Sequence, residues 1–378
     1  MIKVGITGQG GFIGKHLFNY LGLMKDVALI PFKKRYFTES EKLEKFVNSC
    51  DVIIHLAAMN RHDNPQVIYD NNIKLVNRLI NACETTDSTP HIIFSSTSQE
   101  ESDNLYGKSK YDGRKLLEEW SIKNNAKFTG LIIPNVFGPF GNPFYNSFIA
   151  TFAHQLTHDE LPTIDIDKKV KLIYVGELII KIYNDILTKY NQSEKSKFVE
   201  EIKIDHTIEV KVSKVFNLLC NFKQNYFEKG ILPNLNNTFE KNLFNTFLCY
   251  IDPDSFFPFH LKKHADNRGT FVEILKLNSG GQVSFSTTAP GITRGNHFHT
   301  YKAERFIVIK GKAKIVIRKI GTKEKHTFLL DEANPSFVDM PIWYTHNITN
   351  VGDEELYTVF WTNEIFNPDV PDTHYEAV

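Results

Sequence analysis

The sequence contains little cysteine and no excess of charge of either sign. Its four cysteines, Cys50, Cys83, Cys220 and Cys249, are widely spaced and form no Cys-x-x-Cys pair, which argues against a zinc knuckle and a disulfide framework. Lysine plus arginine equals aspartate plus glutamate at 44 each. No net charge is available to hold nucleic acid or an anionic membrane surface, so we predict a small-molecule substrate and no nucleic-acid partner.

The sequence also lacks long apolar runs. None approaches the roughly 20 residues that a membrane span requires, and no secretory signal pattern opens the chain. We therefore predict a cytoplasmic protein with no membrane partner. A length of 378 residues exceeds one ordinary hydrophobic core, so we expect two domains.

The first part of the chain alternates short apolar strands with helical patterns, as in a doubly wound α/β parallel sheet of the Rossmann type. The predicted strands are 3–7, 27–31, 52–56, 91–95 and 129–133, and the predicted helices are 12–23, 72–84 and 108–123. The segment from 151 to about 245 is mixed, with helical spacing over 210–227. We interpret it as a substrate-side lobe that completes the first domain.

Beyond this lobe, Ile251-Asp252-Pro253-Asp254-Ser255 favours a turn, and the sequence becomes strand-like. Short β-rich runs at 270–277, 282–287, 304–310, 312–320 and 356–361 alternate with Gly and Pro turns. Many short strands without a convincing helix indicate a small all-β barrel or jelly roll. We therefore predict two domains, 1–250 and 251–378.

The first predicted strand leads into a glycine-rich loop, Thr7-Gly8-Gln9-Gly10-Gly11-Phe12-Ile13-Gly14, at the start of a helix. Glycines at this spacing permit a sharp turn and a close approach to a pyrophosphate, and the helix N-terminus offers oriented N–H groups. We predict that Gly8, Gly11, Phe12, Ile13 and Gly14 bind a dinucleotide.

The end of the second predicted strand bears on which dinucleotide is bound. NAD sites usually have an acid there for the ribose 2′-hydroxyl, whereas this chain has Lys33, Lys34 and Arg35. Three cations fit the 2′-phosphate of NADPH, although a solvated basic turn is the alternative. We predict NADPH.

A tyrosine and a lysine at helical spacing provide a candidate proton donor. Tyr106 and Lys110 lie at i and i+4 on one helix face, where the ammonium can lower the phenol pKa from about 10. Tyr111 and Lys115 form a second such pair that points away from the first. We favour Tyr106 because it closely follows the hydroxyl-rich run 95–98, which is suited to bind a substrate carbonyl.

The later part of the chain contains a pattern of potential metal ligands. His297 and His299 face the same way in a strand, Glu304 follows after a short turn, and His346 comes from a later strand. Three imidazoles and a carboxylate suit a divalent transition metal. The alternative is a surface histidine pair, or satisfied histidines inside a barrel.

Several motifs together resemble an extended short-chain dehydrogenase/reductase that acts on nucleotide sugars: the glycine loop, His55-Leu56-Ala57-Ala58, Ser95-Ser96-Thr97, Tyr106-x-x-Ser109-Lys110 and Pro134-Asn135-Val136-Phe137-Gly138-Pro139. The resemblance implies that Tyr106 is the catalytic acid and Lys110 its ribose-binding partner. Thr97 would polarise the carbonyl, with Ser96 as the alternative, and Leu56, Ala57 and Ala58 would line the cofactor. Only nine positions separate Thr97 from Tyr106, fewer than is usual in that family.

The C-terminal motifs resemble the cupin family, and Asp266-x-Arg268-Gly269-x-Phe271-x-Glu273 with Arg294-Gly295-Asn296-His297 is similar to dTDP-4-keto-rhamnose 3,5-epimerases. There the histidine matching His297 is a general base; here the pattern suggests a metal ligand, and the proton-removing residue stays open.

Throughout its length the chain resembles the CapF family of bifunctional capsular-polysaccharide enzymes. That resemblance implies 3-epimerisation of a UDP-4-keto-6-deoxy-N-acetyl-L-hexosamine in the cupin and NADPH reduction at C4 in the other domain, toward UDP-N-acetyl-L-fucosamine. It also implies zinc at His297, His299, Glu304 and His346, and a homodimer built through the cupin. Two alternatives are a reductase whose metal cupin is purely structural and a nucleotide-sensing protein without catalysis.

Overall fold

A computed structural model of the chain describes residues 1–191, 198–267, 269–278 and 280–378, and these residues form two compact units. Unit 1 comprises Met1–Phe137, Tyr145–Ser147 and Lys168–Lys211, and unit 2 comprises Gly138–Phe144, Phe148–Asp167 and Val212–Val378. The lobe expected at 151–245 is thus divided between the units. The functional boundary between residues 250 and 251 stays a prediction.

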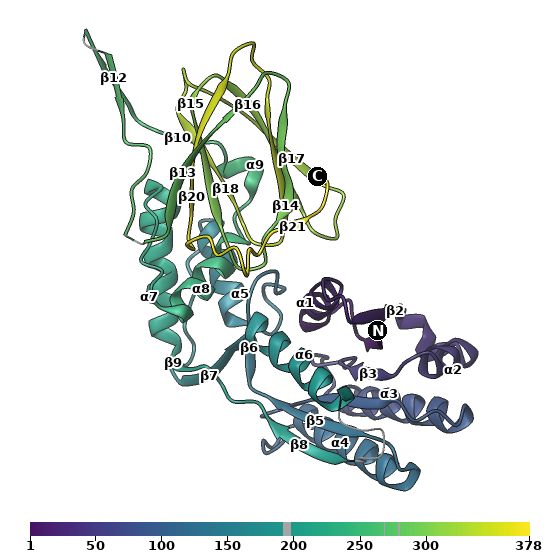
Figure 1. Cartoon of the computed structure of the whole chain (residues 1–378). Helices are drawn as coiled ribbons and strands as arrows, with labels where there is room; N and C mark the ends of the chain where they lie inside the picture. The colour runs from purple at the N-terminus through teal and green to yellow at the C-terminus, as the bar shows by residue number, and fades with distance from the viewer. Residues whose placement is uncertain (192–197, 268, 279) are drawn as a thin grey trace. The chain divides into compact units, whose positions relative to one another are not determined.

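Unit 1 contains the predicted parallel sheet, with six strands in the order β2-β1-β3-β4-β5-β8 (Figure 1). The strands are β1 (Ile2–Thr7), β2 (Val27–Ile30), β3 (Val52–His55), β4 (His91–Thr97), β5 (Phe128–Ile133) and β8 (Val199–Lys203). The chain leaves β1 toward β2 on one side and returns to β3 on the other. The carboxyl ends of β1 and β3 therefore flank the crevice where doubly wound sheets bind ligands.

Helices cover both faces of this sheet because each face is apolar. One hydrophobic cluster includes α1 (Phe12–Leu21) and α6 (Val175–Asn191), and another includes α2 (Ser40–Asn48), α3 (Pro65–Thr85) and α4 (Leu105–Asn124). The remaining elements of unit 1 are the 3₁₀ helix η1 (Lys34–Thr38) and the small sheet of β6 (Asn135–Phe137), β7 (Lys169–Tyr174) and β9 (Ile208–Lys211). The predicted strands and helices are all present, whereas α2, α6 and β8 were not predicted.

Unit 2 combines helices with two five-stranded antiparallel sheets, β10-β18-β15-β20-β13 and β17-β16-β19-β14-β21 (Figure 1). Its helices are α5 (Phe148–Thr157), α7 (Val212–Phe222), the π-helix η2 (Lys223–Phe227), α8 (Thr238–Leu248) and α9 (Pro253–Phe256). Its strands are β10 (Phe259–His260), β11 (Lys263–Asp266), β12 (Gly269–Val272), β13 (Gln282–Thr288), β14 (Thr293–Phe298), β15 (Glu304–Lys310), β16 (Lys312–Lys319), β17 (Lys325–Asp331), β18 (Ser336–Met340), β19 (Tyr344–Asn350), β20 (Leu356–Thr362) and β21 (His374–Tyr375).

The two large sheets of unit 2 share one apolar core, to which Ile307 of β15, Ile315 of β16 and Phe337 of β18 contribute. The all-β character expected for the C-terminal region is confirmed, and the strand predicted at 304–310 coincides with β15. The strand predicted at 270–277 is shorter, because β12 ends at Val272. Arg268 of the epimerase-like motif lies outside the described residues. Among the helices described, none has the length and apolar character needed to cross a bilayer.

Candidate functional site

The glycine loop of unit 1 lies between the carboxyl end of β1 and the first turn of α1, as predicted. Gly11 is the N-cap of α1 and supplies no side-chain cap, and Phe12 and Ile13 are the first two helical residues. Gly8 has a φ of +76°, and a Cβ there would lie 2.8 Å from the backbone nitrogen of Ala57. A Cβ on Gly14 would collide with the carbonyl oxygen of Gly8. Side chains at these two positions are therefore excluded by the backbone itself.

His55 joins the ends of β1 and β3 beneath this loop. Its Nδ1 lies 2.8 Å from Thr7 Oγ1, and its buried ring stacks on Phe94 with centroids 5.7 Å apart. Burial, helped by the charge of Lys110, lowers the pKa of His55 to about 3, so the ring is neutral. The residues that follow, Leu56, Ala57 and Ala58, lie directly after the carboxyl end of β3, and the backbone of Ala57 is close to Gly8 of the glycine loop.

Tyr106 and Lys110 lie in the first turns of α4, whose N-cap Asn104 accepts a hydrogen bond from Gly107 N at 2.7 Å. Lys110 is 3% exposed, and its Nζ lies 4.3 Å from the centre of the Phe94 ring. Burial lowers the pKa of Lys110 to about 7. Burial also raises the pKa of Tyr106, with a smaller contribution from Tyr145.

This direction differs from the expected one. Desolvation of the half-buried phenol is the largest cause of its raised pKa, and Lys110 is not among the causes. A raised pKa keeps Tyr106 protonated at neutral pH, which is the form that donates a proton.

The hydroxyls at the end of β4 are held in different ways. Ser96 donates to Glu100, whose carboxylate also accepts from Arg114 Nε at 2.9 Å and Nη2 at 2.6 Å. Thr97 accepts from Gln99 N at 3.2 Å and so keeps its hydroxyl hydrogen for donation. Adjacent strand residues face opposite sides of the sheet. The Ser96 hydroxyl is therefore engaged by Glu100, which also pairs with Arg114. No sequence motif predicted this role of Glu100.

The predicted 2′-phosphate cations follow β2 at the same end of the sheet. Lys33 is the N-cap of η1, Lys34 begins it, and all three cations are exposed. Arg35 Nε lies 3.5 Å from Glu39, so Arg35 is already paired. Exposed pairs of this kind contribute little, and all three side chains have room to turn toward a ligand.

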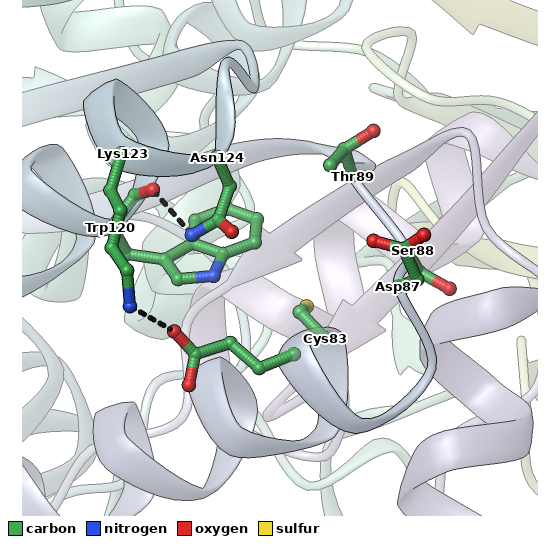
Figure 2. A pocket seen from close by; sticks show the side chains of 8 residues that line it. Cys83, Asp87, Ser88, Thr89, Trp120, Lys123 and Asn124 are labelled. Carbon is green, nitrogen blue, oxygen red and sulfur yellow. Dashed lines mark hydrogen bonds and ion pairs between the residues drawn. The ribbon is translucent and has the colours of Figure 1, made fainter.

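A pocket in unit 1 lies away from all these residues. It is formed by the ends of α3 and α4 and the segment that leads into β4, and its lining includes Cys83, Trp120, Lys123 and Asn124 (Figure 2). These elements meet at the amino ends of the parallel strands. None of the candidate residues lines this pocket.

In unit 2, the four predicted metal ligands converge. Their ligand atoms all lie within 4.8 Å of one another. Glu304 Oε2 lies 3.2 Å from His299 Nε2 and 3.1 Å from His346 Nε2, and the His297 and His346 rings are 4.6 Å apart. His297 and His346 are register partners of β14 and β19, while Glu304 begins β15 in the other sheet.

The polar atoms of this cluster are arranged to bind a metal ion rather than to hydrogen-bond with one another. His299 Nε2, Glu304 Oε2 and His346 Nε2 are buried, yet none has a hydrogen-bond partner of acceptable geometry. Buried polar atoms are normally satisfied, and three that lie within 4.8 Å of one another fit one shared partner such as a metal ion. This donor set, three imidazoles and one carboxylate, suits a divalent transition metal.

The protonation states also suit ligation. Burial lowers the pKa of His297 to about 4, with smaller contributions from His346 and His299. Burial acts to raise the pKa of Glu304, but His299 and His346 outweigh it and hold that pKa well below its ordinary value. Neutral imidazole and ionised carboxylate are the forms that bind metal.

A bulge in β14 places the histidines. The register with β19 shifts between Gly295 and His297, where Gly295 has a φ of +99° and Asn296 a φ of 59°. A Cβ on Gly295 would lie 2.8 Å from the carbonyl oxygen of His346. One residue that contacts the cluster was not predicted: the backbone carbonyl of Asp372 lies 2.5 Å from His299 Nδ1. It lies 73 positions from His299, and no motif marks it.

Comparisons with known proteins agree with this geometry. The model of the NAD dependent epimerase/dehydratase family matches residues 4–200, and that of the polysaccharide biosynthesis C-terminal domain matches residues 264–374. The crystal structure of the capsular polysaccharide assembling protein CapF from Staphylococcus aureus is 33% identical, with full coverage of both chains and a TM-score of 0.63. The chain belongs to the CapF family.

A relative from Pseudomonas aeruginosa is named UDP-2-acetamido-2,6-beta-L-arabino-hexul-4-ose reductase. It is 29% identical over 374 residues, which are 99% of this chain and 98% of the relative. RMD from Pseudomonas aeruginosa, solved with NADPH, is 21% identical over 59% of this chain and 83% of its own, with a TM-score of 0.52. That last likeness shows a shared fold.

Proposed function

We propose that this CapF-family chain is a bifunctional UDP-sugar enzyme of capsule or O-antigen synthesis. It 3-epimerises a UDP-4-keto-6-deoxy-N-acetyl-L-hexosamine and reduces the C4 ketone with NADPH, toward UDP-N-acetyl-L-fucosamine. The reductase activity is supported by the Tyr106–Lys110 pair of α4, by the glycine loop of the same unit and by the name of the Pseudomonas aeruginosa relative. The second activity depends on one observation, the convergence of four ligand atoms in unit 2.

In the reductase site, bound NADPH supplies the hydride. The glycine loop and the N-terminus of α1 bind the pyrophosphate, and Leu56, Ala57 and Ala58 line the dinucleotide. Thr97 donates a hydrogen bond to the ketone oxygen, and Tyr106 then transfers its phenolic proton to that oxygen as the alcohol forms. Lys110, one helical turn after Tyr106, binds the ribose.

In the epimerase site, we propose that His297, His299, Glu304 and His346 hold Zn²⁺ within a cupin jelly roll. A divalent cation bound there supplies Lewis-acid chemistry that stabilises negative charge on a ketone oxygen. The protein's own part is to bring the four ligand atoms together, with the His297 ring neutral and the Glu304 carboxylate ionised. We further propose that the enzyme is a cytoplasmic homodimer built through this cupin.

The competing hypothesis keeps the reductase and gives the metal a structural, dimerising role. The test is incubation of the purified protein with UDP-4-keto-6-deoxy sugars in deuterated water, with and without NADPH. We expect deuterium at C3 without NADPH, and loss of NADPH absorbance when it is present. NADPH oxidation without any C3 exchange would support the structural metal instead, and no change in either readout would favour a binding protein.

Joint replacement of Lys33, Lys34 and Arg35 by alanine is expected to raise KM for NADPH by about 10-fold or more, because charge-assisted phosphate contacts contribute about 1.5–3 kcal/mol each. The KM for NADH, which lacks the 2′-phosphate, should change little. The ratio of kcat/KM for the two cofactors measures the effect. An unchanged ratio would place the 2′-phosphate elsewhere.

Gly14→Ala is expected to weaken NADPH binding by at least about 10-fold, since the new methyl group has to displace the Gly8 carbonyl and the loop that approaches the pyrophosphate. Gly10→Ala is a matched control in the same loop, because its added Cβ meets no atom within 4 Å. Fluorescence titration with NADPH measures both. Equal affinity in the two variants would contradict the proposed role of this loop.

A further inference from the structure

We propose that Asp372 is a positioning residue that fixes the ring of His299 for metal binding, an inference that rests on the proposed metal site. The carbonyl oxygen of Asp372 lies 2.5 Å from His299 Nδ1, and the His299 side chain is 3% exposed. A carbonyl oxygen only accepts hydrogen bonds, so Nδ1 carries the hydrogen. The lone pair of the neutral ring is then on Nε2, which lies 3.2 Å from Glu304.

The side chain of Asp372 acts on the turn that connects two ligands. Its carboxylate accepts from the backbone N of Thr300 at 2.9 Å, of Tyr301 at 3.0 Å and of Lys302 at 3.1 Å, and from Thr300 Oγ1 at 2.6 Å. These three residues lie between His299 and Glu304. The buried carboxylate of Asp372 therefore sets the path of the chain from His299 to Glu304, while the backbone carbonyl of the same residue orients His299.

Asp372 begins the C-terminal segment 372–378, whose later residues bind to β14 and so fix its position. Its φ of 44° turns the chain toward β21, which pairs with β14 so that His374 opposes Phe298 and Tyr375 opposes His297. Farther along, Glu376 N donates to the carbonyl of Asn296 at 3.0 Å. The segment thus runs beside β14, which carries His297 and ends one residue before His299, and Asp372 contacts the turn that follows this strand.

The arrangement has the form of an outer-shell hydrogen bond to a metal-bound histidine. Such bonds fix the tautomer and the ring orientation, and their loss typically lowers metal affinity by 10–100-fold. If the Asp372 contacts only stabilised the fold, their loss would lower the unfolding temperature without changing the zinc affinity of the folded protein. The two roles are therefore separable by measuring zinc affinity well below the unfolding transition.

The experiment compares zinc affinity of the full-length protein by competition with a chromophoric chelator. Asp372→Ala keeps the backbone carbonyl but removes the carboxylate contacts that hold it and the 300–302 turn in place. We expect this variant to bind zinc about 10–100-fold more weakly than wild type, because the carbonyl then no longer fixes the His299 ring. Asp372→Asn retains one acceptor oxygen and should recover part of that loss. Asp353→Ala, an exposed aspartate of the same unit, is the control and should bind like wild type. Wild-type affinity in a folded Asp372→Ala would overturn the inference.

A second measurement uses only the wild type and so does not depend on how the variants fold. In zinc-loaded protein labelled with ¹⁵N-histidine, His299 should show a protonated Nδ1 and a metal-bound Nε2. Zinc bound through Nδ1 would overturn the inference while leaving the metal site intact. Failure of the wild type to bind zinc at all would instead overturn the proposed site, and the inference with it.

Discussion

Tyr106→Phe is expected to lower kcat for NADPH-dependent ketone reduction by about 10²–10⁴-fold, the usual contribution of a positioned general acid. The substitution removes one oxygen and leaves the half-buried ring in place, so the fold and the affinity for NADPH should change little. Burial raises the pKa of this phenol, which keeps its proton available across the neutral range. Steady-state loss of NADPH absorbance measures the effect.

Tyr111→Phe provides the matched control on the same helix. Tyr111 is 43% exposed, and its ring is approached by Arg114 at 5.5 Å and Lys115 at 5.9 Å, as expected for a surface residue. We expect the Tyr111→Phe variant to reduce the ketone at the wild-type rate. Deuterium exchange at C3 should survive in both variants. If the Tyr111 variant were inactive and the Tyr106 variant active, the assignment of the proton donor would be wrong.

His346→Ala is expected to abolish stoichiometric zinc binding and to slow C3 deuterium exchange on the order of 10³-fold, because Lewis-acid stabilisation contributes several kcal/mol. His346 is 1% exposed and shares Glu304 with His299, so its removal leaves the carboxylate short of a partner. Metal content of the purified protein and mass spectrometry of the sugar measure the two effects.

The informative companion assay is reduction of a sugar that already has the product configuration at C3. This activity depends on unit 1, so His346→Ala should retain it near the wild-type rate. His260→Ala, an exposed histidine of β10, should leave both activities unchanged. If the metal-free His346→Ala variant still exchanged deuterium at C3, the proposed role of the metal in epimerisation would be wrong.

Sequence patterns predicted those features that neighbouring residues in the chain determine. The glycine loop is one contiguous strand, turn and helix, and the candidate ligands His297 and His299 lie two residues apart in a strand-like run, so both patterns are visible in the sequence alone. Strand β15 matches its prediction residue for residue because its hydrophobic run is bounded by Glu304 and Gly311. Local chemistry was sufficient in these places.

Contacts between distant residues could not be predicted in this way. The commitment of Ser96 to Glu100 and Arg114 needs the packing of α4 against the end of β4. Likewise, the carbonyl that orients His299 belongs to Asp372, which only the return of the C-terminal segment brings near. The phenol pKa was predicted in the wrong direction because helical spacing reports the neighbouring lysine but not the burial of Tyr106.

The burial of Lys110 has a consequence for acid tolerance. An unfolded chain holds a lysine proton up to a pH of about 10.4, whereas burial lowers the pKa of Lys110 in the folded chain to about 7. Between these values unfolding takes up a proton, so the penalty that this residue imposes on the native state shrinks as the pH rises. Below neutrality the full penalty applies, so we expect the protein to resist unfolding less well in acid than in mild alkali as far as this residue is concerned.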